Sequence, residues 1–154
     1  MAFTRGPLLL IYALSHQSSQ LLAARFAGCP LTPDDFAVYS ALRLMAPCTP
    51  SDLANTLGMR ASTLSNYLRR MQERGHLRRR RNPRDGRSTL IRLTPSGVRA
   101  TEGCFPAFGA AIRAVRTRLG DRENDVLAAM EELSRCLAEA IAEAPAELHV
   151  AAQG

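Results

Sequence analysis

Residues 76–97 read HLRRRRNPRDGRSTLIRLTPSG, and this stretch decides the fold. Its middle holds two turn dipeptides, Asn82-Pro83 and Asp85-Gly86. After the turn, the side chains of Thr89, Ile91 and Leu93 alternate with Ser88, Leu90 and Arg92. This period of two indicates a strand. Thr94-Pro95 then predicts a helix start, with threonine as the cap and proline at the first helical position. The stretch therefore predicts a short β-hairpin with an arginine-rich turn, followed directly by a helix.

Positive charge is concentrated around this hairpin. Residues 60–99 contain 12 arginines and two acids, whereas the rest of the chain has eight arginines and 12 acids, for a net charge of +6. A local basic face on an otherwise acidic chain is typical of a nucleic-acid binder. The arginines fall on one predicted helix and on the hairpin after it, which favours that interpretation over an ordinary solvated surface.

Length and composition limit the class of protein. A chain of 154 residues, 46% of them apolar, is expected to form one domain, or one domain with helical extensions, with a real core. The longest apolar stretch, residues 7–14, is too short to span a bilayer, and residues 15–20 do not resemble a signal-peptide cleavage site. We therefore expect a cytoplasmic protein.

The sequence offers little for catalysis or metal binding. It has three histidines, no nucleophile elbow, no phosphate loop and no paired carboxylates in an apolar setting, so an enzyme is not expected. No cysteines form a CxxC pair and no histidine stands at metal spacing from them, so no metal or cofactor is expected. We expect reduced structural thiols, with a redox-sensing cysteine as the alternative, at Cys29, Cys48, Cys104 and Cys136.

Thr-Pro dipeptides also mark two earlier helix starts, Thr32-Pro33 and Thr49-Pro50. Each threonine is followed three residues later by an acid, Asp35 or Asp52, in a pattern that resembles a capping box. Together with the apolar periodicity, these signals predict helices over about residues 7–26, 33–45, 50–57 and 61–74. At the inner face of the second helix we expect Phe36, Tyr39, Leu42 and either Leu44 or Met45.

Two long helices are predicted after the hairpin. The first runs to Leu119 with a kink near Pro106, and the second follows Gly120 with Asp121 as its cap and runs to about residue 144. Both carry apolar residues at alternating spacings of three and four, and residues 7–26 are also strongly apolar. One chain offers too little surface to cover these faces, so we expect a dimer built from both termini. From residue 145 onward we expect a frayed tail.

The helices over 50–57 and 61–74 have the features of a helix-turn-helix. Ala54 is small where the two helices would approach, and Gly58 suits the turn. Hydroxyl, amide and guanidinium groups that read base edges and hold phosphates dominate the predicted outer face of the second helix. These are Ser62, Thr63, Ser65, Asn66, Arg69 and Arg70.

Residues 31–97 resemble the winged helix-turn-helix of the MarR family of bacterial transcriptional regulators. The matching segments are LTPDDFAVYSAL, SDLANTLG, STLSNYLRRMQERG and the run from Asp85-Gly86-Arg87 to Leu93-Thr94-Pro95-Ser96-Gly97. The resemblance implies a mainly α protein with a small β-hairpin wing. It implies N- and C-terminal dimerisation helices in residues 1–30 and 98–145, and a tail at 146–154. It also implies a homodimeric repressor of a palindromic operator in double-stranded DNA, released by a small aromatic or phenolic ligand.

The resemblance assigns roles to particular residues. DNA contacts fall on Ser51, Arg60, Ser62, Thr63, Ser65, Asn66, Arg69, Arg70, Arg80, Arg84, Asp85 and Arg87, with Asp85 orienting Arg87 through an ion pair. Ligand contacts fall on Tyr12, His16, Phe36 and Tyr39. Arginines at 60, 78, 81 and 84 depart from the family pattern and suggest strong attraction to phosphate of any sequence. These arginines leave a sequence-indifferent architectural DNA-binding protein as one alternative. The cysteines leave a redox-responsive regulator as another.

Overall fold

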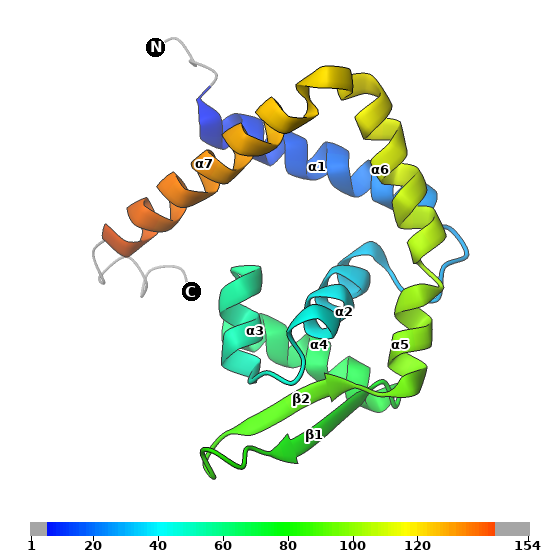
Figure 1. Ribbon diagram of the computed structural model, residues 1–154, viewed down its shortest axis with the longest axis vertical. Helices are drawn as coiled ribbons and strands as arrows, with labels where there is room; N and C mark the ends of the chain where they lie inside the picture. Colours follow the sequence, from blue (N-terminus) through cyan, green and yellow to red (C-terminus); the bar gives the residue numbers. More distant parts are fainter. Residues whose placement is uncertain (1–5, 144–154) are drawn as a thin grey trace, which may run out of the picture. The chain divides into compact units, whose positions relative to one another are not determined.

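The computed structural model of the chain describes residues 6–143 and consists of helices with one two-stranded hairpin (Figure 1). This is the mainly α class with a small β-hairpin that the sequence predicts. The chain divides into two compact units, Met1–Ile112 and Arg113–Gly154. The predicted tail at 146–154 and the predicted helix end at residue 144 lie outside the described residues.

Four helices precede the hairpin, and they lie within two residues of the predicted ranges. They are α1 (Pro7–Arg25), α2 (Pro33–Met45), α3 (Pro50–Leu57) and α4 (Ala61–Glu73). At the start of α3 the predicted capping box is present: Thr49 and Asp52 each accept a hydrogen bond from the other's backbone N–H. At the start of α2 only half of it forms. Thr32 accepts from the Asp35 N–H, but the Asp35 carboxylate turns to other partners.

The hairpin consists of the antiparallel strands β1 (Leu77–Arg81) and β2 (Thr89–Leu93). Leu77 pairs with Leu93 at one end and Arg81 with Thr89 at the other. Ile91 is fully buried, and its backbone also pairs with Cys48 in the α2–α3 connection, at N···O distances of 2.9 and 3.4 Å. This bridge fixes the base of the hairpin to the helices.

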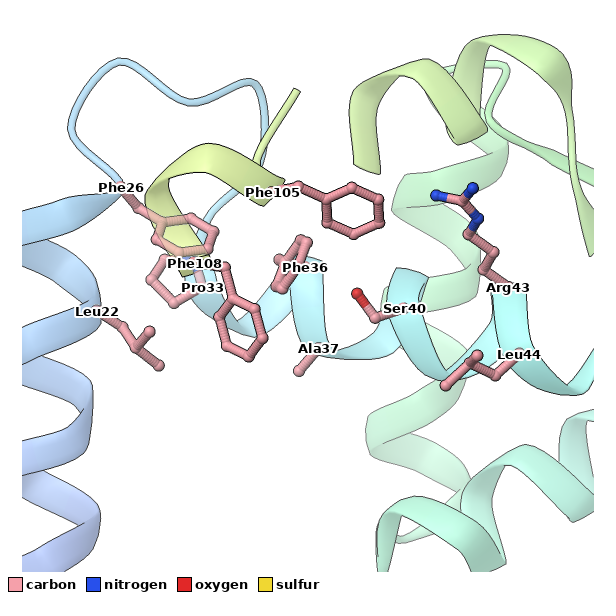
Figure 2. A pocket seen from close by; sticks show the side chains of 10 residues that line it. All are labelled: Leu22, Phe26, Pro33, Phe36, Ala37, Ser40, Arg43, Leu44, Phe105 and Phe108. Carbon is pink, nitrogen blue, oxygen red and sulfur yellow. The ribbon is translucent and has the colours of Figure 1, made fainter. Parts of the chain in front are cut away.

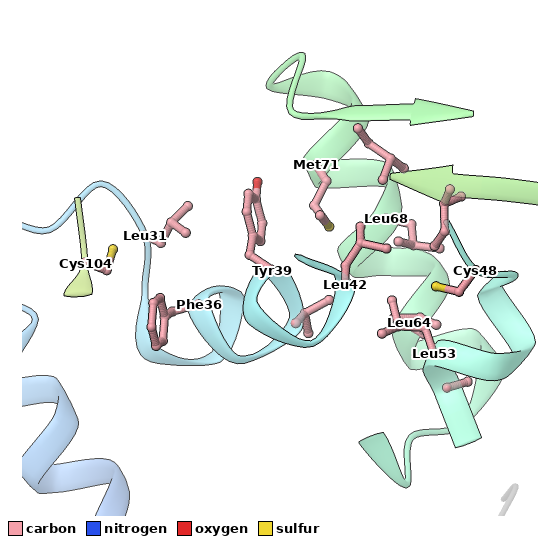
Figure 3. Close-up of a cluster of buried hydrophobic side chains, with 14 of the residues drawn as sticks. Leu31, Phe36, Tyr39, Leu42, Cys48, Leu53, Leu64, Leu68, Met71 and Cys104 are labelled. Atoms are coloured by element: carbon pink, nitrogen blue, oxygen red, sulfur yellow. The ribbon is translucent and has the colours of Figure 1, made fainter. Parts of the chain in front are cut away.

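One apolar core in the first unit holds helices α2 to α4, the hairpin and α5 (Pro95–Glu102) together (Figure 3). The side chains of Tyr39 and Leu42 from α2 lie between α3, α4 and β2, and are fully buried. Leu44 is 88% exposed, so Met45 is the inner residue at the end of α2. The other large, fully buried side chains at the centre are Leu53, Leu64, Leu68, Met71 and Ile91.

The predicted single helix after the hairpin is two helices, α5 (Pro95–Glu102) and α6 (Phe105–Leu119). The break falls at Gly103 and Cys104, before the proline expected to cause a kink. Cys104 is fully buried, and a Cβ on Gly103 would lie 3.1 Å from Cγ of Pro30, so packing against the α1–α2 connection ends α5 here. Pro106 lies in the first turn of α6, where a missing N–H breaks no helical hydrogen bond.

The second unit contains the end of α6, the short 3₁₀ helix η1 (Gly120–Arg122) and α7 (Glu123–Glu143). Asp121 lies inside η1 and does not cap α7, contrary to the prediction, because the chain tightens into a 3₁₀ turn before the helix begins. Arg116 Nε donates to Glu123 Oε1 across this turn at 2.5 Å. None of the α7 residues is buried. Over residues 6–143, no helix combines the length and apolar character needed to cross a membrane.

Candidate nucleic-acid interface

Helices α3 and α4 form the predicted helix-turn-helix. Gly58 ends α3 in the left-handed conformation, with φ of 60°, which glycine adopts without the steric cost of a Cβ. The Met59 N–H then donates to the Ala54 carbonyl at 2.9 Å and closes the turn. Ala54 is buried between the helices, as its small size predicts. The start of α4 has no side-chain cap, because Arg60 stands at that position.

The buried face of α4 determines which of its side chains reach solvent. Leu64, Leu68 and Met71 face the core, and the helix is strongly amphipathic, so its other side is polar and exposed. All but one of the α4 residues predicted to contact DNA lie on that exposed side, with Ser51 of α3 and Arg60 of the turn also exposed. The exposed α4 residues are Ser62, Thr63, Ser65, Asn66 and Arg69.

Arg70 is the exception. Its Nη2 lies 3.1 Å from Oδ1 of Asp35, and its guanidinium stacks on the Tyr67 ring at 4.4 Å from the centroid. Arg74 binds the other oxygen of the same carboxylate, at 2.7 Å. The Arg70 side chain therefore joins α4 to α2, and it is only 40% exposed. The sequence does not point to this pairing, because the position of Asp35 three residues after Thr32 is explained equally well by a capping box.

The Asp35 carboxylate is buried, and its two arginine partners compensate for that burial. Burial alone disfavours the charged form, but the hydrogen bonds and positive charges of Arg74 and Arg70 outweigh it and lower the pKa of Asp35. The carboxylate is thus ionised at neutral pH. The resulting cluster, Asp35–Arg70–Arg74, sets the position of the C-terminal half of α4 against α2.

The tip of the hairpin is organised by its own polar side chains. Asn82 Oδ1 accepts from the Arg84 N–H at 3.0 Å, and Asp85 Oδ1 accepts from the Arg87 N–H at 3.1 Å. The predicted ion pair between the side chains of Asp85 and Arg87 is therefore wrong. The short aspartate side chain closes an Asx turn on the Arg87 backbone and leaves the guanidinium exposed.

Arginines point outward along the whole hairpin. Arg81 Nε donates to the Gly86 carbonyl at 3.0 Å, and Arg79 Nε donates to Gln72 of α4 at 3.1 Å. Four other arginines, on β1 and at the tip, make no hydrogen bond through their side chains within residues 6–143. They are Arg78, Arg80, Arg84 and Arg87, and all four are exposed.

The hairpin is tied to the end of α4 by the residues that follow β2. The hydroxyls of Thr94 and Ser96 both donate to the Gly75 carbonyl, at 2.8 and 3.1 Å. A Cβ on Gly97 would lie 2.5 Å from the His76 carbonyl oxygen, so only glycine allows α5 to approach so closely. These contacts explain the Thr-Pro-Ser-Gly motif: it holds the hairpin rigidly against α4.

His76 joins the same junction to α2. The Tyr39 hydroxyl and His76 Nδ1 are 3.0 Å apart, and the two rings meet edge to face. Burial and the nearby charge of Arg74 lower the pKa of His76, so the imidazole is neutral at pH 7 and shares a hydrogen bond with the Tyr39 hydroxyl through Nδ1. Burial also raises the pKa of Tyr39. The predicted ligand residue Tyr39 is therefore a fully buried core residue.

The first unit contains a cavity of about 490 Å³ with aromatic walls (Figure 2). Of the four residues predicted to contact a ligand, only Phe36 lines it, whereas Tyr12 and His16 stack on each other on α1, 4.6 Å between ring centroids. This cavity therefore contains one of the four predicted residues, and the ligand role of the other three stays a prediction. The cavity walls are formed by Leu22, Phe26, Pro33, Phe36, Ala37, Ser40, Arg43, Leu44, Phe105 and Phe108.

Two polar groups in the cavity were not predicted. The Ser40 hydroxyl is buried and has no hydrogen-bond partner, and the Arg43 guanidinium pairs with Glu102 at 3.0 Å beside the Phe105 ring. Phe36, Ser40 and Arg43 follow one another at spacings of four and three, which places them on one face of α2. That spacing was a signal available in the sequence.

The described residues offer no metal site: over 6–143, no three side chains of His, Cys, Asp or Glu are grouped to hold an ion. All four cysteines are free, with Cys48 and Cys104 buried, Cys29 partly exposed and Cys136 exposed. Burial raises the pKa of both buried thiols.

Comparison with known proteins bears directly on this geometry. The sequence profile of the MarR family matches residues 30–88, which cover α2 to the tip of the hairpin. MarR of Salmonella typhimurium, the multiple antibiotic resistance protein, is 30% identical over 100 residues, covering 65% of this chain and 69% of its own. The chain belongs to the MarR family. It is therefore a DNA-binding transcriptional regulator with a winged-helix fold.

Solved structures of MarR-family proteins share the fold. A mutant Escherichia coli MarR in complex with operator DNA is 26% identical, with a TM-score of 0.71 over 83% of this chain and 90% of that one. PcaV, a transcriptional regulator of Streptomyces coelicolor whose structure holds its natural ligand, is 24% identical. Its TM-score is 0.71 over 92% of this chain and 99% of PcaV. In the winged-helix fold the hairpin is the wing, and α4, the second helix of the helix-turn-helix, is the recognition helix.

Proposed function

We propose that this MarR-family protein is a repressor that binds a palindromic operator as a homodimer and is released by a small aromatic ligand. The observation that carries the proposal is the pairing, within one unit, of an exposed polar face on α4 with an arginine-lined wing. Because the proposed partner is operator DNA, we propose the cytoplasm as the site of action.

The two surfaces suit different parts of a duplex. Ser62, Thr63 and Asn66 lie at the N-terminal half of α4, the part of a recognition helix that meets base edges in the major groove. Arg84 and Arg87 at the wing tip suit the negative potential of an adjacent minor groove. Ser51, Arg60, Arg69 and Arg80 are exposed around these surfaces and suit phosphates. The Asp35 cluster withdraws Arg70 from base contacts and makes it a positioning residue.

Exposed apolar side chains support the homodimer. The α1 helix has no buried residue, and α7 has none either. Leu8 and Tyr12 are 67% and 64% exposed, and Met130 and Ile141 on α7 are 57% and 68% exposed. Apolar faces of this extent are covered in soluble proteins, and a second copy of the same helices supplies the matching surface. Two-fold symmetry then requires a palindromic operator.

The cavity supports release by a ligand. Its walls are aromatic, and its polar groups are the unpaired Ser40 hydroxyl and the Arg43 guanidinium, which together suit an aromatic ring bearing a carboxylate or phenol. A ligand carboxylate would compete with Glu102 for Arg43. Because Phe36 and Asp35 are neighbours on α2, a shift of α2 at the cavity reaches the recognition helix through Arg70 and Arg74.

A salt titration with two duplexes tests the proposal against the architectural alternative, which the arginine-rich wing favours. One duplex carries an inverted repeat selected by the protein, and the other has the same length and composition in random order. A repressor should prefer the repeat by about 10³-fold or more at physiological salt. Equal affinities with the same salt slope would support a sequence-indifferent binder instead.

Addition of salicylate, an aromatic acid with a phenol, tests the ligand step. We expect it to weaken binding of the inverted repeat, and Arg43→Gln to reduce the response while leaving DNA binding of the free protein nearly unchanged. Glu102→Gln should sensitise the protein, because it removes the competitor for Arg43. An identical response in all three proteins would contradict the assignment of the cavity.

A further inference from the structure

The chain enters the winged-helix region through the α1–α2 connection and leaves it through the α5–α6 connection, and each connection contains a cysteine. Cys29 lies in the connection between α1 and α2, and Cys104 lies between α5 and α6. The connections pack directly on each other, because a Cβ on Gly103 would lie 3.1 Å from Cγ of Pro30. Each of these two residues is the sequence neighbour of one cysteine. Both cysteines pack within the same apolar cluster.

The two thiols are neighbours in different environments. Cys104 is fully buried, and its Sγ donates to the Ala100 carbonyl at 3.4 Å. Burial raises the pKa of the Cys104 thiol, the adjacent Cys29 thiol adds to the rise, and the Leu31 backbone N–H opposes it. Figure 3 shows the Cys104 sulfur beside Leu31. Cys29 is partly exposed, so an oxidant from solvent reaches Cys29 first.

We propose that Cys29 and Cys104 are an oxidation-sensitive pair, which a hydroperoxide converts into an intrachain disulfide that ties the two connections together and weakens DNA binding. The other cysteines do not share this arrangement. Cys48 is buried in the α2–α3 connection, and Cys136 is exposed on α7 in the second unit.

The oxidation proceeds in two steps. The Cys29 thiolate attacks the terminal oxygen of the hydroperoxide, the O–O bond breaks, and the leaving oxygen takes up a proton, which gives a sulfenic acid. The Cys104 sulfur then attacks the Cys29 sulfur, the S–O bond breaks, and hydroxide leaves as water with the Cys104 proton. The two thiols lose two electrons to the peroxide, and a dithiol reductant reverses the reaction.

The disulfide affects DNA binding because of where the two cysteines lie. An S–S bond of about 2.05 Å is shorter than the contact between two thiols, so its formation draws the two sulfurs together and, in our proposal, the connections with them. Phe26 and Phe105 flank the two connections and line the cavity beside α2. The movement therefore reaches α2 and, through Asp35, the recognition helix. This step rests on the proposed function, whereas formation of the disulfide does not.

Peptide mapping tests the disulfide without DNA. The chain has no lysine, so trypsin cleaves at arginine and places the four cysteines on four peptides, residues 26–43, 44–60, 100–113 and 136–154. The full chain is treated with hydrogen peroxide under native conditions, alkylated and digested. We expect peptides 26–43 and 100–113 to be joined with the loss of two hydrogens, and to separate after dithiothreitol. Their absence, or links that mainly involve 44–60 or 136–154, would overturn the proposal.

The effect on DNA is measured with the selected inverted repeat. We expect the oxidised protein to bind it at least about fivefold more weakly, with recovery after reduction. Cys29→Ser should bind normally and not respond to peroxide, and Cys136→Ser should respond as the unaltered protein does. A linked peptide with unchanged affinity would overturn the regulatory step. Failure of the reduced protein to bind any repeat would instead contradict the proposed function.

Discussion

Asp35 Oδ2 accepts a 2.7 Å hydrogen bond from Nη1 of Arg74, and this contact fixes the recognition helix to α2. The same carboxylate binds Arg70 through its other oxygen. Phe36, the next residue along α2, lines the aromatic cavity. Asp35 and Phe36 are consecutive in α2, so one contacts the recognition helix and the other lines the cavity. In the proposed function these are the two parts that a ligand signal connects.

Replacing Asp35 tests the importance of this contact. Asp35→Asn removes the charge that both arginines share, and we expect the free energy of unfolding to fall by about 1–3 kcal/mol. The cost is below that of a fully buried pair because each arginine stays 40% exposed and regains water. Urea denaturation measures the loss. Glu102→Gln, which breaks the more exposed pair with Arg43, is the control and should cost less than about 1 kcal/mol. Equal losses in both variants would argue against a special role for Asp35.

The lowered pKa of Asp35 predicts a loss of stability in acid. A carboxyl group whose pKa is lower in the folded state contributes stability that is present above its unfolded pKa and disappears as pH falls through the folded value. We therefore expect the free energy of unfolding to decrease below about pH 4. The decrease should be smaller in Asp35→Asn than in the unaltered protein. Parallel curves for the two proteins would place the acid sensitivity elsewhere.

His76 predicts a second change at higher pH. Its pKa is lowered in the folded state, so the unfolded chain binds the proton more readily, and stability is full above about pH 6.5 and declines as pH falls below it. His76→Asn keeps an acceptor for the Tyr39 hydroxyl but does not titrate. Thermal unfolding between pH 5.5 and 7.5 should shift less in this variant. If the shift is the same, the Tyr39–His76 contact is not its cause.

The recognition helix and the wing should differ in what they contribute to binding. Asn66→Ala should cost about 1–3 kcal/mol on the operator and little on random DNA, because in the proposed complex its amide meets base edges. Arg87→Ala should weaken both duplexes in similar proportion and reduce the salt slope, because phosphate contacts carry little sequence information. Fluorescence anisotropy over a salt series measures both. The reverse pattern would mean that the two surfaces are wrongly assigned, even within the MarR fold.

Charge on the exposed face of α1 should separate the subunits. Leu8 and Tyr12 lie four residues apart on one side of the helix, and burying two glutamates there in a dimer would be costly. We expect Leu8→Glu/Tyr12→Glu to sediment as a monomer at micromolar concentration, and the unaltered protein to sediment as the proposed dimer. Leu44→Glu, a substitution at an even more exposed leucine of α2, is the control and should remain a dimer. A dimeric double variant would locate the interface elsewhere.

Local signals were enough to predict much of the fold. Thr32, Thr49 and Thr94 all accept backbone hydrogen bonds at helix starts, as the Thr-Pro dipeptides indicate. The hairpin and the exposed face of α4 follow from periods of two and 3.6 residues. These features depend on neighbours within a few positions, which is why the sequence alone reveals them.

Features that depend on distant contacts were not predicted correctly. Asp35 looked like half of a capping box, but its partner Arg74 lies 39 residues away. The helix break at Cys104 results from packing against the α1–α2 connection, and a kink at Pro106 was the only local signal. Tyr39 is fully buried in the core, and an aromatic ring at helical spacing gives no indication in the sequence of what it packs against.

Selection from a pool of random duplexes by the protein tests the central claim most directly. Our account predicts an enriched inverted repeat with half-site centres about one helical turn apart, bound by two copies of the chain and protected symmetrically in footprinting. An unenriched pool bound with uniform affinity, or a single asymmetric half-site occupied by one copy, would contradict it.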